Sequence, residues 1–321
     1  MTISVIIATY NRAAMLADCL GHLARQGFEP GDEIIVVDNG STDETPRIIA
    51  EMQSRSPIPI IRLEEPAAGK SRAIARALPV ATGDILAFTD DDVEVDASWL
   101  DAIRRAIADP DIALVGGPVA PRWERTPPRW LRRATEQYKR LTAPLGLADY
   151  GTTCIELGPR TALGGNLAIR RDVFARVGGF AAHLGKVRGT LLSGEDHDLC
   201  RRVQAAGLRT VYDPGIRVRH WVQADRMRVR YQLSWFFWSG ITHAELDAAD
   251  PQPGRRLAGI PLYLIRRAPT ATLRAAAALL RCDLARAIDS LTDAAFALGY
   301  ASRSYRRTAA PAAITPVARQ S

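Results

Sequence analysis

The 321-residue sequence contains few cysteines, and they are too scattered to form a recognisable site. No two of them make a C-x-x-C pair. This pattern argues against both a zinc domain and a disulfide scaffold, and it fits a reducing compartment. The four positions are Cys19, Cys154, Cys200 and Cys282.

Long hydrophobic runs are also missing. No apolar stretch approaches the roughly 18 residues of a membrane-spanning helix, and residues 1–10 lack the basic start of a signal peptide. With 47% hydrophobic, 24% charged and 7% aromatic residues, the composition is that of an ordinary globular protein, neither disordered nor collagen-like. We therefore expect a cytoplasmic protein with room for one large α/β domain and an appendage, or for two modest domains.

Two common nucleotide-binding signatures are absent. Gly69-Lys70-Ser71 would complete a P-loop only with glycine at position 64, where the chain has Glu64. No G-x-G-x-x-G follows a predicted strand, so the usual dinucleotide fingerprint is missing too. We find no DNA- or RNA-binding motif either, and we expect no nucleic-acid partner.

The net charge of +7 is confined to the C-terminal part of the chain. Residues 225–321 contain 14 arginines and 7 acidic residues, so residues 1–224 are neutral overall. A solvated arginine-rich face and a surface for an anionic partner explain this excess equally well.

The first hundred residues alternate strand-like and helical patterns. The strand-like runs are almost continuously apolar, as in sheets that helices cover on both faces. This order predicts an α/β fold with a doubly wound, mostly parallel, nucleotide-binding sheet, and Ser41 and Thr42 are predicted to cap its second helix. The predicted strands are 2–9, 33–38, 58–63 and 84–89, and the predicted helices are 13–25, 43–54 and 70–81.

The remainder of the chain divides into three regions. Residues 123–157 are rich in proline and arginine, and they predict an irregular connection within a first domain of residues 1–224. Residues 225–307 predict a helical C-terminal region, and residues 308–321 predict a disordered tail. The later elements of the first domain are predicted at 163–170 (strand), 195–206 (helix) and 216–220 (strand).

Polar residues follow four of the strands, at the edge where ligands bind in such sheets. The most acidic of these segments is Asp90-Asp91-Asp92. Adjacent carboxylates repel one another unless a cation lies among them, and Mg²⁺ or Mn²⁺ prefers oxygen ligands and bridges carboxylates to diphosphates. The triplet is therefore a candidate metal and nucleotide site, and a solvated turn before a helix near Asp96 is the alternative.

Other charged residues also have two explanations. Glu195 and Asp196 open a helix, where they either cap it or take a proton from an attacking hydroxyl group. Lys70 and Arg72, at another helix start, either contact phosphate or lie on the surface. His220, at the end of the last predicted strand, is by base rate more often a structural histidine than a ligand.

Taken together, these segments resemble the family 2 glycosyltransferases with the GT-A fold, in the same order from Ser4 to about His220. Asp90 and Asp92 occupy the paired positions of a D-x-D motif. The segments that carry the resemblance are Val5–Arg12, Val36–Asp43, Gly69–Ala73, Ala81–Asp84, Phe88–Asp92, Gly164–Asn166, Val177–Phe180, Gly194–Leu199, Tyr212–Pro214 and Val218–His220.

The resemblance implies inverting transfer of a sugar from a nucleoside diphosphate sugar to a hydroxyl acceptor, a glycan or lipid-linked glycan, in surface polysaccharide or glycoconjugate synthesis. It implies a Mg²⁺ or Mn²⁺ ion held by Asp92 and His220, with Asp196 as catalytic base. The implied nucleotide-sugar contacts are Thr9, Tyr10, Asn11, Asp38 (to the base), Lys70, Arg72, Asp90 (to the ribose) and Asp91. The implied acceptor-side residues are Gly165, Asn166 and Glu195.

Two other functions compete with this one. A sugar-nucleotidyltransferase requires a glycine-rich basic loop after the first strand, where this chain has Ala8-Thr9-Tyr10-Asn11. A non-catalytic nucleotide- or glycan-binding domain would not need Asp196 for turnover. In the C-terminal region the apolar clusters 233–238 and 257–265 coincide with arginines, so peripheral binding to an anionic membrane at its inner face and simple core packing both remain open.

Overall fold

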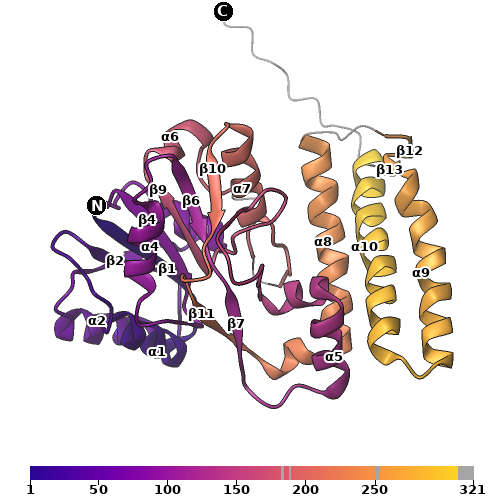
Figure 1. Ribbon diagram of the computed structural model, residues 1–321, viewed down its shortest axis with the longest axis horizontal. Helices are drawn as coiled ribbons and strands as arrows, with labels where there is room; N and C mark the ends of the chain where they lie inside the picture. The colour runs from indigo at the N-terminus through magenta and orange to yellow at the C-terminus, as the bar shows by residue number, and fades with distance from the viewer. Residues whose placement is uncertain (182–183, 188, 250–253, 310–321) are drawn as a thin grey trace, which may run out of the picture. The chain divides into compact units, whose positions relative to one another are not determined.

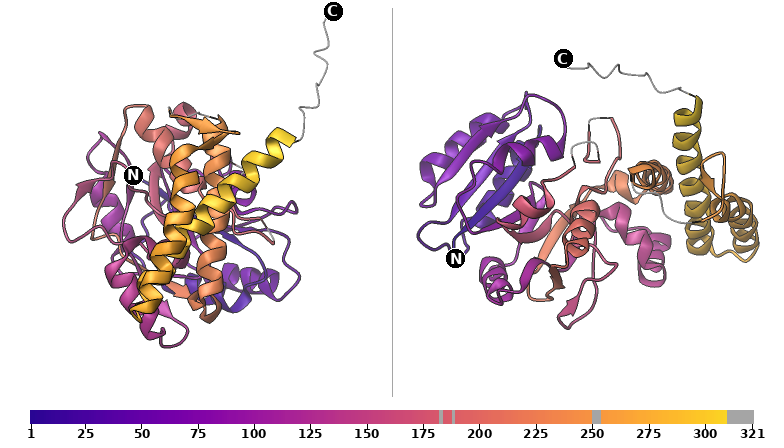
Figure 2. Two further views of the ribbon diagram at one scale, coloured as in Figure 1. Left: turned by 90° about the vertical axis from the view of Figure 1, so that its right-hand side faces the viewer. Right: turned by 90° about the horizontal axis from the view of Figure 1, so that it is seen from above.

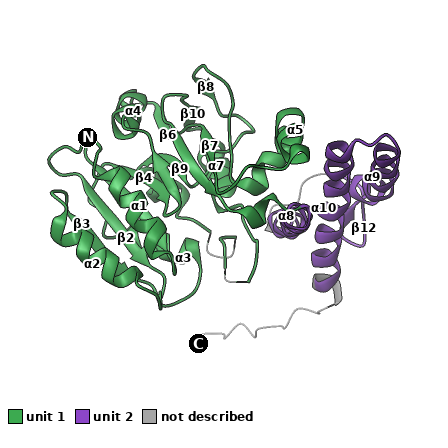
Figure 3. Cartoon of the chain, turned by 90° about the horizontal axis from the view of Figure 1, so that it is seen from below, with its two compact units in different colours: residues 1–228 green, residues 229–321 purple. Residues whose placement is uncertain are grey.

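The computed structural model describes residues 1–181, 184–187, 189–249 and 254–309 (Figure 1). The chain divides into two compact units, residues 1–228 and residues 229–321, here called unit 1 and unit 2 (Figure 3). Of the tail predicted at 308–321, residues 310–321 lie outside the described residues.

An eight-stranded mixed sheet is the scaffold of unit 1, with strand order β3-β2-β1-β4-β9-β6-β10-β8 (Figure 1). The pairs among β1, β2, β3 and β4 and the pair β6–β10 are parallel, whereas β9 is antiparallel to both of its neighbours. The predicted α/β class with a mostly parallel sheet is confirmed. The strands are β1 Ile3–Thr9, β2 Glu33–Asp38, β3 Ile60–Glu64, β4 Ile85–Asp90, β6 Ile112–Gly116, β8 Ile155–Glu156, β9 Asn166–Arg170 and β10 Arg209–Tyr212.

Helices bury both faces of this sheet. In β1, Ile3 and Ile7 belong to a core that includes residues of α1, α2 and α4, and Ile6 belongs to a second core that includes residues of α3, α6 and α7. Because successive side chains of a strand point to opposite faces, a strand between two cores is apolar throughout. The helices are α1 Ala13–Leu23, α2 Thr45–Arg55, α3 Lys70–Ala77, α4 Trp99–Ile107, α6 Val173–Val177 and α7 Glu195–Ala205.

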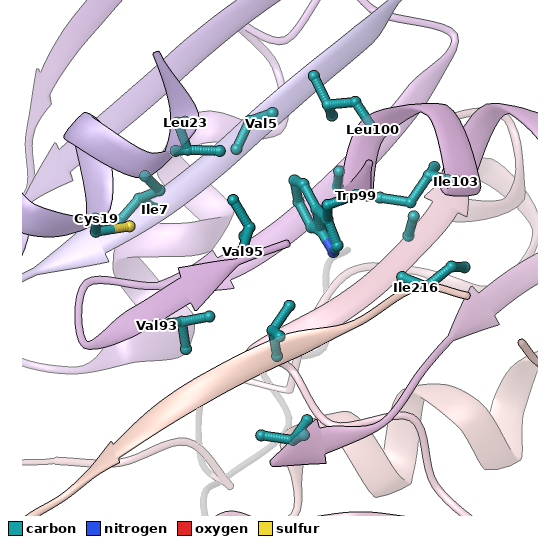
Figure 4. Packing of buried hydrophobic residues seen from close by; sticks show 14 of the residues in the cluster. Val5, Ile7, Cys19, Leu23, Val93, Val95, Trp99, Leu100, Ile103 and Ile216 are labelled. Atoms are coloured by element: carbon teal, nitrogen blue, oxygen red, sulfur yellow. The ribbon is translucent and has the colours of Figure 1, made fainter. Parts of the chain in front are cut away.

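Trp99 is the largest side chain buried in the first core, and Figure 4 shows it among Val95, Leu100 and Ile103. Its indole Nε1 donates a hydrogen bond to Oδ1 of Asn166 at 2.8 Å. This bond satisfies an N–H group whose burial without a partner would be costly. It also fixes the first residue of β9, next to the edge of the sheet where polar residues gather.

A second, three-stranded sheet has the order β5-β11-β7. Its strands are β5 Val93–Val95, β7 Val119–Trp123 and β11 Val218–Val222. β11 is antiparallel to β5 and places His220 opposite Val93, the residue that follows the acidic triplet. A strand from the end of unit 1 thereby reaches the turn after β4.

Several local predictions are wrong. The segment 123–157, expected to be irregular, contains α5 Arg129–Gln137 and the 3-10 helix η1 Lys139–Leu145. Helix α5 buries Leu131 and Ala134, three residues apart on one face, and Pro128 precedes it at a position that tolerates proline.

Other errors concern where elements begin. Helix α2 begins at Thr45, so Ser41 and Thr42 do not cap it, and its preceding residue Glu44 makes no capping bond through its side chain. The strand predicted at 163–170 starts only at residue 166, and the helix expected near residue 96 starts at residue 99.

Unit 2 contains three long helices, α8 Val229–Ala249, α9 Leu262–Leu280 and α10 Leu284–Ala309, with the short strands β12 Arg256–Leu257 and β13 Ile260–Pro261; η2 Ala224–Met227 precedes it in unit 1. Helices α8 and α9 each pack against α10 (Figure 2). A Cβ on Gly299 would lie 1.8 Å from the carbonyl oxygen of Phe237, so α8 and α10 approach backbone to backbone. Among the described residues, no helix combines the length and the apolar character needed to cross a bilayer.

Candidate active site

The acidic triplet lies at the carboxyl end of β4, and its three side chains have different surroundings. Asp90 ends the strand and keeps 27% of its side chain exposed, whereas the side chains of Asp91 and Asp92 keep 5% and 3%. The strand ends at Asp90 and the chain turns at Asp91 and Asp92, so one carboxylate stays partly exposed and two are buried. Because Asp91 and Asp92 are buried, the alternative prediction of a solvated acidic turn is wrong for these two residues.

Asp91 is bound by the first strand and by a guanidinium group. Thr9 Oγ1 donates to Asp91 Oδ2 at 2.8 Å, and Arg12 Nη1 donates to Asp91 Oδ1 at 2.7 Å. Burial raises the pKa of Asp91 to about 6, although the charge of Arg12 opposes the shift. Arg12 Nη1 also donates to Asp92 Oδ2 at 2.8 Å, so one guanidinium group compensates both buried carboxylates.

Asp92 faces a histidine and a second arginine from the other end of unit 1. His220 Nε2 lies 3.5 Å from Asp92 Oδ1, and Arg226 Nη2 lies 3.9 Å from Asp92 Oδ2. Burial alone would raise the pKa of Asp92, but the interactions with His220, Arg12 and Arg226 hold it well below its usual range. Asp92 is therefore a buried, ionised carboxylate.

The imidazole ring of His220 is held in place from one side by Gly146. A Cβ there would lie 3.1 Å from Cε1 of His220, and the φ angle of this residue is +68°. His220 Nδ1 is buried without a hydrogen-bond partner, while Nε2 points to Asp92. Nε2 also lies 3.2 Å from Nη1 of Arg226, so a cation bound by this nitrogen would displace the arginine contact.

These donors fit a divalent cation only in part. Within the part of the chain that the structure describes, no three His, Cys, Asp or Glu side chains converge to form a complete metal site. Asp92 Oδ1 and His220 Nε2 are one oxygen and one nitrogen donor, 3.5 Å apart. Since Mg²⁺ is usually held by one or two protein groups together with substrate phosphates, this pair fits a cation that shares its ligands with a diphosphate.

Lys70 interacts both with the acidic triplet and with a second acidic pair, Glu195 and Asp196. It is the first residue of α3, and its Nζ forms an ion pair with Oδ1 of Asp90. Burial lowers the pKa of Lys70, but the charges of Asp90, Glu195 and Asp196 outweigh burial and raise it. Lys70 is therefore charged and lies within reach of both acidic groups.

Asp196 lies in the first turn of α7. Its Oδ2 accepts a hydrogen bond from the backbone N–H of Gly164 at 3.1 Å, and its Oδ1 accepts one from the N–H of His197 at 2.8 Å. The neighbouring Glu195 is 8% exposed, and burial together with the charge of Asp196 raises its pKa to about 7. The second pair thus contains a carboxyl group that titrates near neutral pH.

Two glycines separate the acidic groups. A Cβ on Gly165 would lie 3.2 Å from Asp90 Oδ2, and a Cβ on Gly164 would lie 3.9 Å from Asp196 Oδ2. The chain between them is therefore thin enough for Asp90, Lys70 and Asp196 to share one site. The sequence places Asp196 more than a hundred positions after Lys70 and Asp90, and the fold brings the three together.

On the nucleotide side, the loops after β1 and β2 are tied together. Asn11, with a φ of +49°, accepts a hydrogen bond from the N–H of Thr42 at 2.7 Å and donates its own N–H to Ser41 Oγ at 3.0 Å. Asp38 is buried at the end of β2, and its Oδ1 accepts from the N–H of Ser41 at 2.9 Å. Tyr10, directly before Asn11 in the chain, is half-buried.

Two predicted contact residues lie outside this cluster. Arg72 is exposed, and its aliphatic stem passes Gly69. Asn166 is fully buried, with its Nδ2 donating to the carbonyl oxygens of Pro118 and Ile216 at 3.1 and 2.7 Å. Since the Trp99 indole bonds its Oδ1, this side chain joins structural elements, and its acceptor-side role stays a prediction.

Three cationic residues were not assigned roles from the sequence. Arg12 and Arg226 compensate the buried carboxylates as described. Lys186 is exposed to solvent, and its backbone oxygen accepts a hydrogen bond from the N–H of Lys70 at 3.0 Å. It follows Gly185, where a Cβ would lie 1.9 Å from Ser71 Oγ. The glycine in this segment was the only sequence signal for such an approach.

The sequence model of glycosyl transferase family 2 matches residues 4–178, more than half of the chain. The chain belongs to this family. The match includes the acidic triplet and the loops after β1 and β2, and it ends before Asp196 and His220. This family 2 glycosyltransferase has the GT-A fold expected from its sequence.

Curated relatives support the assignment over most of the chain. The glucosyl-dolichyl phosphate glucuronosyltransferase of Haloferax volcanii is 25% identical over 256 residues, covering 78% of this chain and 79% of that protein. The O-antigen chain rhamnosyltransferase of Salmonella typhimurium is 28% identical over 246 residues, covering 76% and 73%. Relatives of this glycosyltransferase therefore act in the synthesis of polysaccharides and glycoconjugates.

Among solved structures, a mannosyltransferase from Pyrobaculum calidifontis in complex with GDP-Man and Mn²⁺ superposes with a TM-score of 0.61 at 21% identity, covering 94% of this chain and 86% of that one. A structure of GalNAc-T7 with UDP, GalNAc and Mn²⁺ gives a TM-score of 0.53 at 18% identity, covering 79% and 52%. At these identities the likeness concerns the fold.

Proposed function

We propose that this family 2 glycosyltransferase transfers a sugar from a nucleoside diphosphate sugar to a hydroxyl acceptor with inversion at the anomeric carbon. One observation carries the proposal: Lys70 pairs with Asp90, and a Cβ on Gly164 would lie 3.8 Å from Lys70 Nζ and 3.9 Å from Asp196 Oδ2. The end of the predicted donor site and the predicted base are therefore parts of one site, as a single displacement at one carbon requires.

On the donor side, the loops tied through Asn11 and Asp38 form the surface for the nucleotide. Asp38 accepts from the base and Asp90 from the ribose, with Thr9, Tyr10 and Asp91 beside them. Asp91 is already bound by Thr9 and Arg12, so its contribution is to hold this surface rigid.

Asp92 and His220 would hold a Mg²⁺ or Mn²⁺ ion, which, when bound, neutralises charge on the departing diphosphate. Mn²⁺ is bound in the two superposed structures. Arg12 and Arg226 keep Asp92 ionised, and hence in the form that binds a cation.

On the acceptor side, Asp196 takes the proton of the attacking hydroxyl group. The acceptor oxygen forms its bond to the anomeric carbon as the bond from that carbon to the diphosphate oxygen breaks, and the electron pair leaves with the nucleoside diphosphate. The N–H of Gly164 holds Asp196 in place. Glu195, partly protonated near pH 7, lowers the negative charge beside it.

For the acceptor, we propose a glycan or lipid-linked glycan of a surface polysaccharide or glycoconjugate. The relatives named for O-antigen and dolichyl phosphate chemistry support this class. We also propose that the enzyme acts in the cytoplasm, at the inner face of a membrane.

The deciding experiment is a donor screen. Release of nucleoside diphosphate from a panel of UDP-, GDP- and dTDP-sugars is measured with Mn²⁺, with Mg²⁺ and with chelator, for the wild type and for Asp196→Asn. We expect cation-dependent release from one donor class and its loss in the variant. A sugar-nucleotidyltransferase would instead release pyrophosphate from a nucleoside triphosphate, and a binding domain would show donor binding without turnover.

A further inference from the structure

The α9–α10 helix pair of unit 2 ends in a turn whose apolar side chains face solvent. Leu279 and Leu284 are 54% and 45% exposed, and Leu280, between them, is 89% exposed. Exposed leucines are normal when scattered, but three within six residues at the end of a helical hairpin form a compact apolar patch. We call residues 279–286 the hairpin tip.

Hydrogen bonds close the backbone of the hairpin tip. The N–H of Cys282 donates to the carbonyl oxygen of Leu279 at 2.9 Å, and the N–H of Asp283 donates to that of Ala278 at the same distance. Asp283 Oδ1 accepts a hydrogen bond from the N–H of Arg286 at 3.1 Å, so the Asp283 side chain caps the start of α10. The leucines are therefore presented by a closed turn that does not fold them back onto the helices.

The hairpin tip also carries positive charge. Arg281 and Arg286 are exposed beside the leucines, whereas Asp283, the acidic residue of the tip, is half-buried, so residues 279–286 carry a net charge of +1. Residues 262–306 contain seven arginines and three aspartates. Asp293, the aspartate that pairs with Arg267 and Arg274, lies between α9 and α10 and not at the tip.

We propose that the hairpin tip binds the interface of an anionic membrane, with Leu279, Leu280 and Leu284 among the acyl chains and the arginines at the lipid head groups. Apolar insertion and attraction to anionic lipid reinforce each other at such a surface. The inference rests on the proposed function in one respect, that a lipid-linked acceptor would be met there.

The positive charge of the hairpin tip favours an anionic membrane over a second copy of the chain as its partner. Two hairpin tips in contact would bring Arg281 and Arg286 of each copy together, and like charges across an interface are unfavourable. An anionic lipid surface offers the opposite charge. The tip is also short, and its three leucines bury far less area than a stable dimer requires.

The test is sedimentation of the full chain with phosphatidylglycerol-containing and pure phosphatidylcholine vesicles at low and high salt. We expect binding to the anionic vesicles only, weakened by salt. Leu280→Gln should weaken this binding about tenfold through lost apolar burial, and Arg281→Gln with Arg286→Gln should weaken it by a similar factor at low salt.

Leu257→Gln is the matched control. Leu257 is 63% exposed but lies in β12, at the opposite end of α9 and thus roughly 28 Å from the tip. This variant should bind vesicles like the wild type, and each variant should keep its melting temperature.

Absence of vesicle binding, binding that ignores lipid charge, or an equal effect of L257Q and L280Q would overturn the proposal. A concentration-dependent dimer that L280Q dissociates would identify a second copy as the occupant instead. Nucleoside diphosphate release without vesicles is measured on the same samples. If nucleoside diphosphate is released but the protein does not bind vesicles, only the membrane inference fails. If the protein binds vesicles but releases no nucleoside diphosphate, the result counts against the proposed function.

Discussion

The two acidic pairs of unit 1 differ in how their charge is balanced. Asp91 and Asp92 share one guanidinium group, that of Arg12, at 2.7 and 2.8 Å. Glu195 and Asp196 face a lysine that is already paired with another carboxylate. The first pair is neutralised by a fixed partner, and the second pair is neutralised only in part.

This difference separates two tasks. In the first pair, Asp92 stays ionised because its pKa is held well below the usual range, so this carboxylate offers constant charge, whereas burial raises the pKa of its neighbour Asp91 to about 6. In the second pair, the pKa of Glu195 is raised to about 7, so the charge changes with protonation in the neutral range. A fixed charge suits the binding of a cation and diphosphate, and a changing one suits proton transfer.

The largest expected effect is on the second pair. Asp196→Asn should lower the transfer rate by about 10²–10⁴-fold and leave donor affinity nearly unchanged, because an amide keeps the shape and loses the proton acceptor. Steady-state kinetics and donor titration measure the two quantities.

Asp198→Asn is the control for this variant, because Asp198 lies on the same helix and pairs with Arg202 at 2.8 Å. It should change the transfer rate less than about tenfold. A loss below tenfold in D196N, or equal losses in both variants, would move the base elsewhere.

The next effect concerns the partner of the first pair. Arg12→Met keeps much of the side-chain volume but leaves two buried carboxylates without their shared cation, so we expect a loss of about 3–5 kcal/mol in the free energy of unfolding. Denaturant unfolding measures it. Arg47→Met, at a 63% exposed arginine paired with Glu44, should leave the free energy of unfolding nearly unchanged. Similar costs at both positions would show that Arg12 does not balance the pair.

A smaller effect separates the members of the first pair. Asp92→Asn should weaken donor binding at least about tenfold in Mn²⁺ and make the affinity insensitive to chelator, because a cation ligand is lost. Calorimetric titration with and without chelator measures this. Asp91→Asn, whose carboxylate faces Thr9 and Arg12, should keep the chelator sensitivity. If D92N responds to chelator as the wild type does, the cation is held by other groups.

The smallest effect is a pH dependence of stability. Because the pKa of Glu195 is raised to about 7 in the folded protein from an ordinary value of 4.5, the folded state holds a proton that the unfolded state releases between these values. This contribution is present below pH 4.5 and is lost as the pH rises to 7.

Glu195→Gln should therefore gain stability relative to the wild type between pH 5 and pH 8, by on the order of 1–3 kcal/mol. Denaturant unfolding at several pH values measures the difference. D91N should flatten the same curve mainly below pH 6, since the pKa of Asp91 is raised to about 6. Parallel curves for E195Q and the wild type would mean that Glu195 does not titrate there.

The sequence predicted the α/β class and the strands around the site, because apolar runs such as residues 3–9 and 33–38 are local signals of strands between two helix layers. It also located the acidic groups at the correct strand and helix ends. Cap positions were less predictable: Ser41 and Thr42 have good cap side chains, but a long-range contact with Asn11 engages them.

What the sequence did not predict is the pairing of charges. Arg12, Lys186 and Arg226 are three among 42 basic residues, and nothing local distinguishes them from arginines on the surface. Their partners are chosen by strand register and by loop paths. Likewise, Asn166 is part of a family-like motif, yet Trp99 and two backbone carbonyls use its hydrogen-bonding groups.

The pairing of β5 with β11 also sets an order of assembly. During synthesis the acidic turn is made early, and its partner His220 is made only near the end of unit 1. At ordinary synthesis rates, on the order of ten seconds separate the two on the ribosome. During that interval β5 is an unpaired edge and Asp92 lacks its histidine. A chain interrupted before residue 218 would hold most of the large sheet without a finished site, so the acidic turn is completed only in chains that have been translated through unit 1.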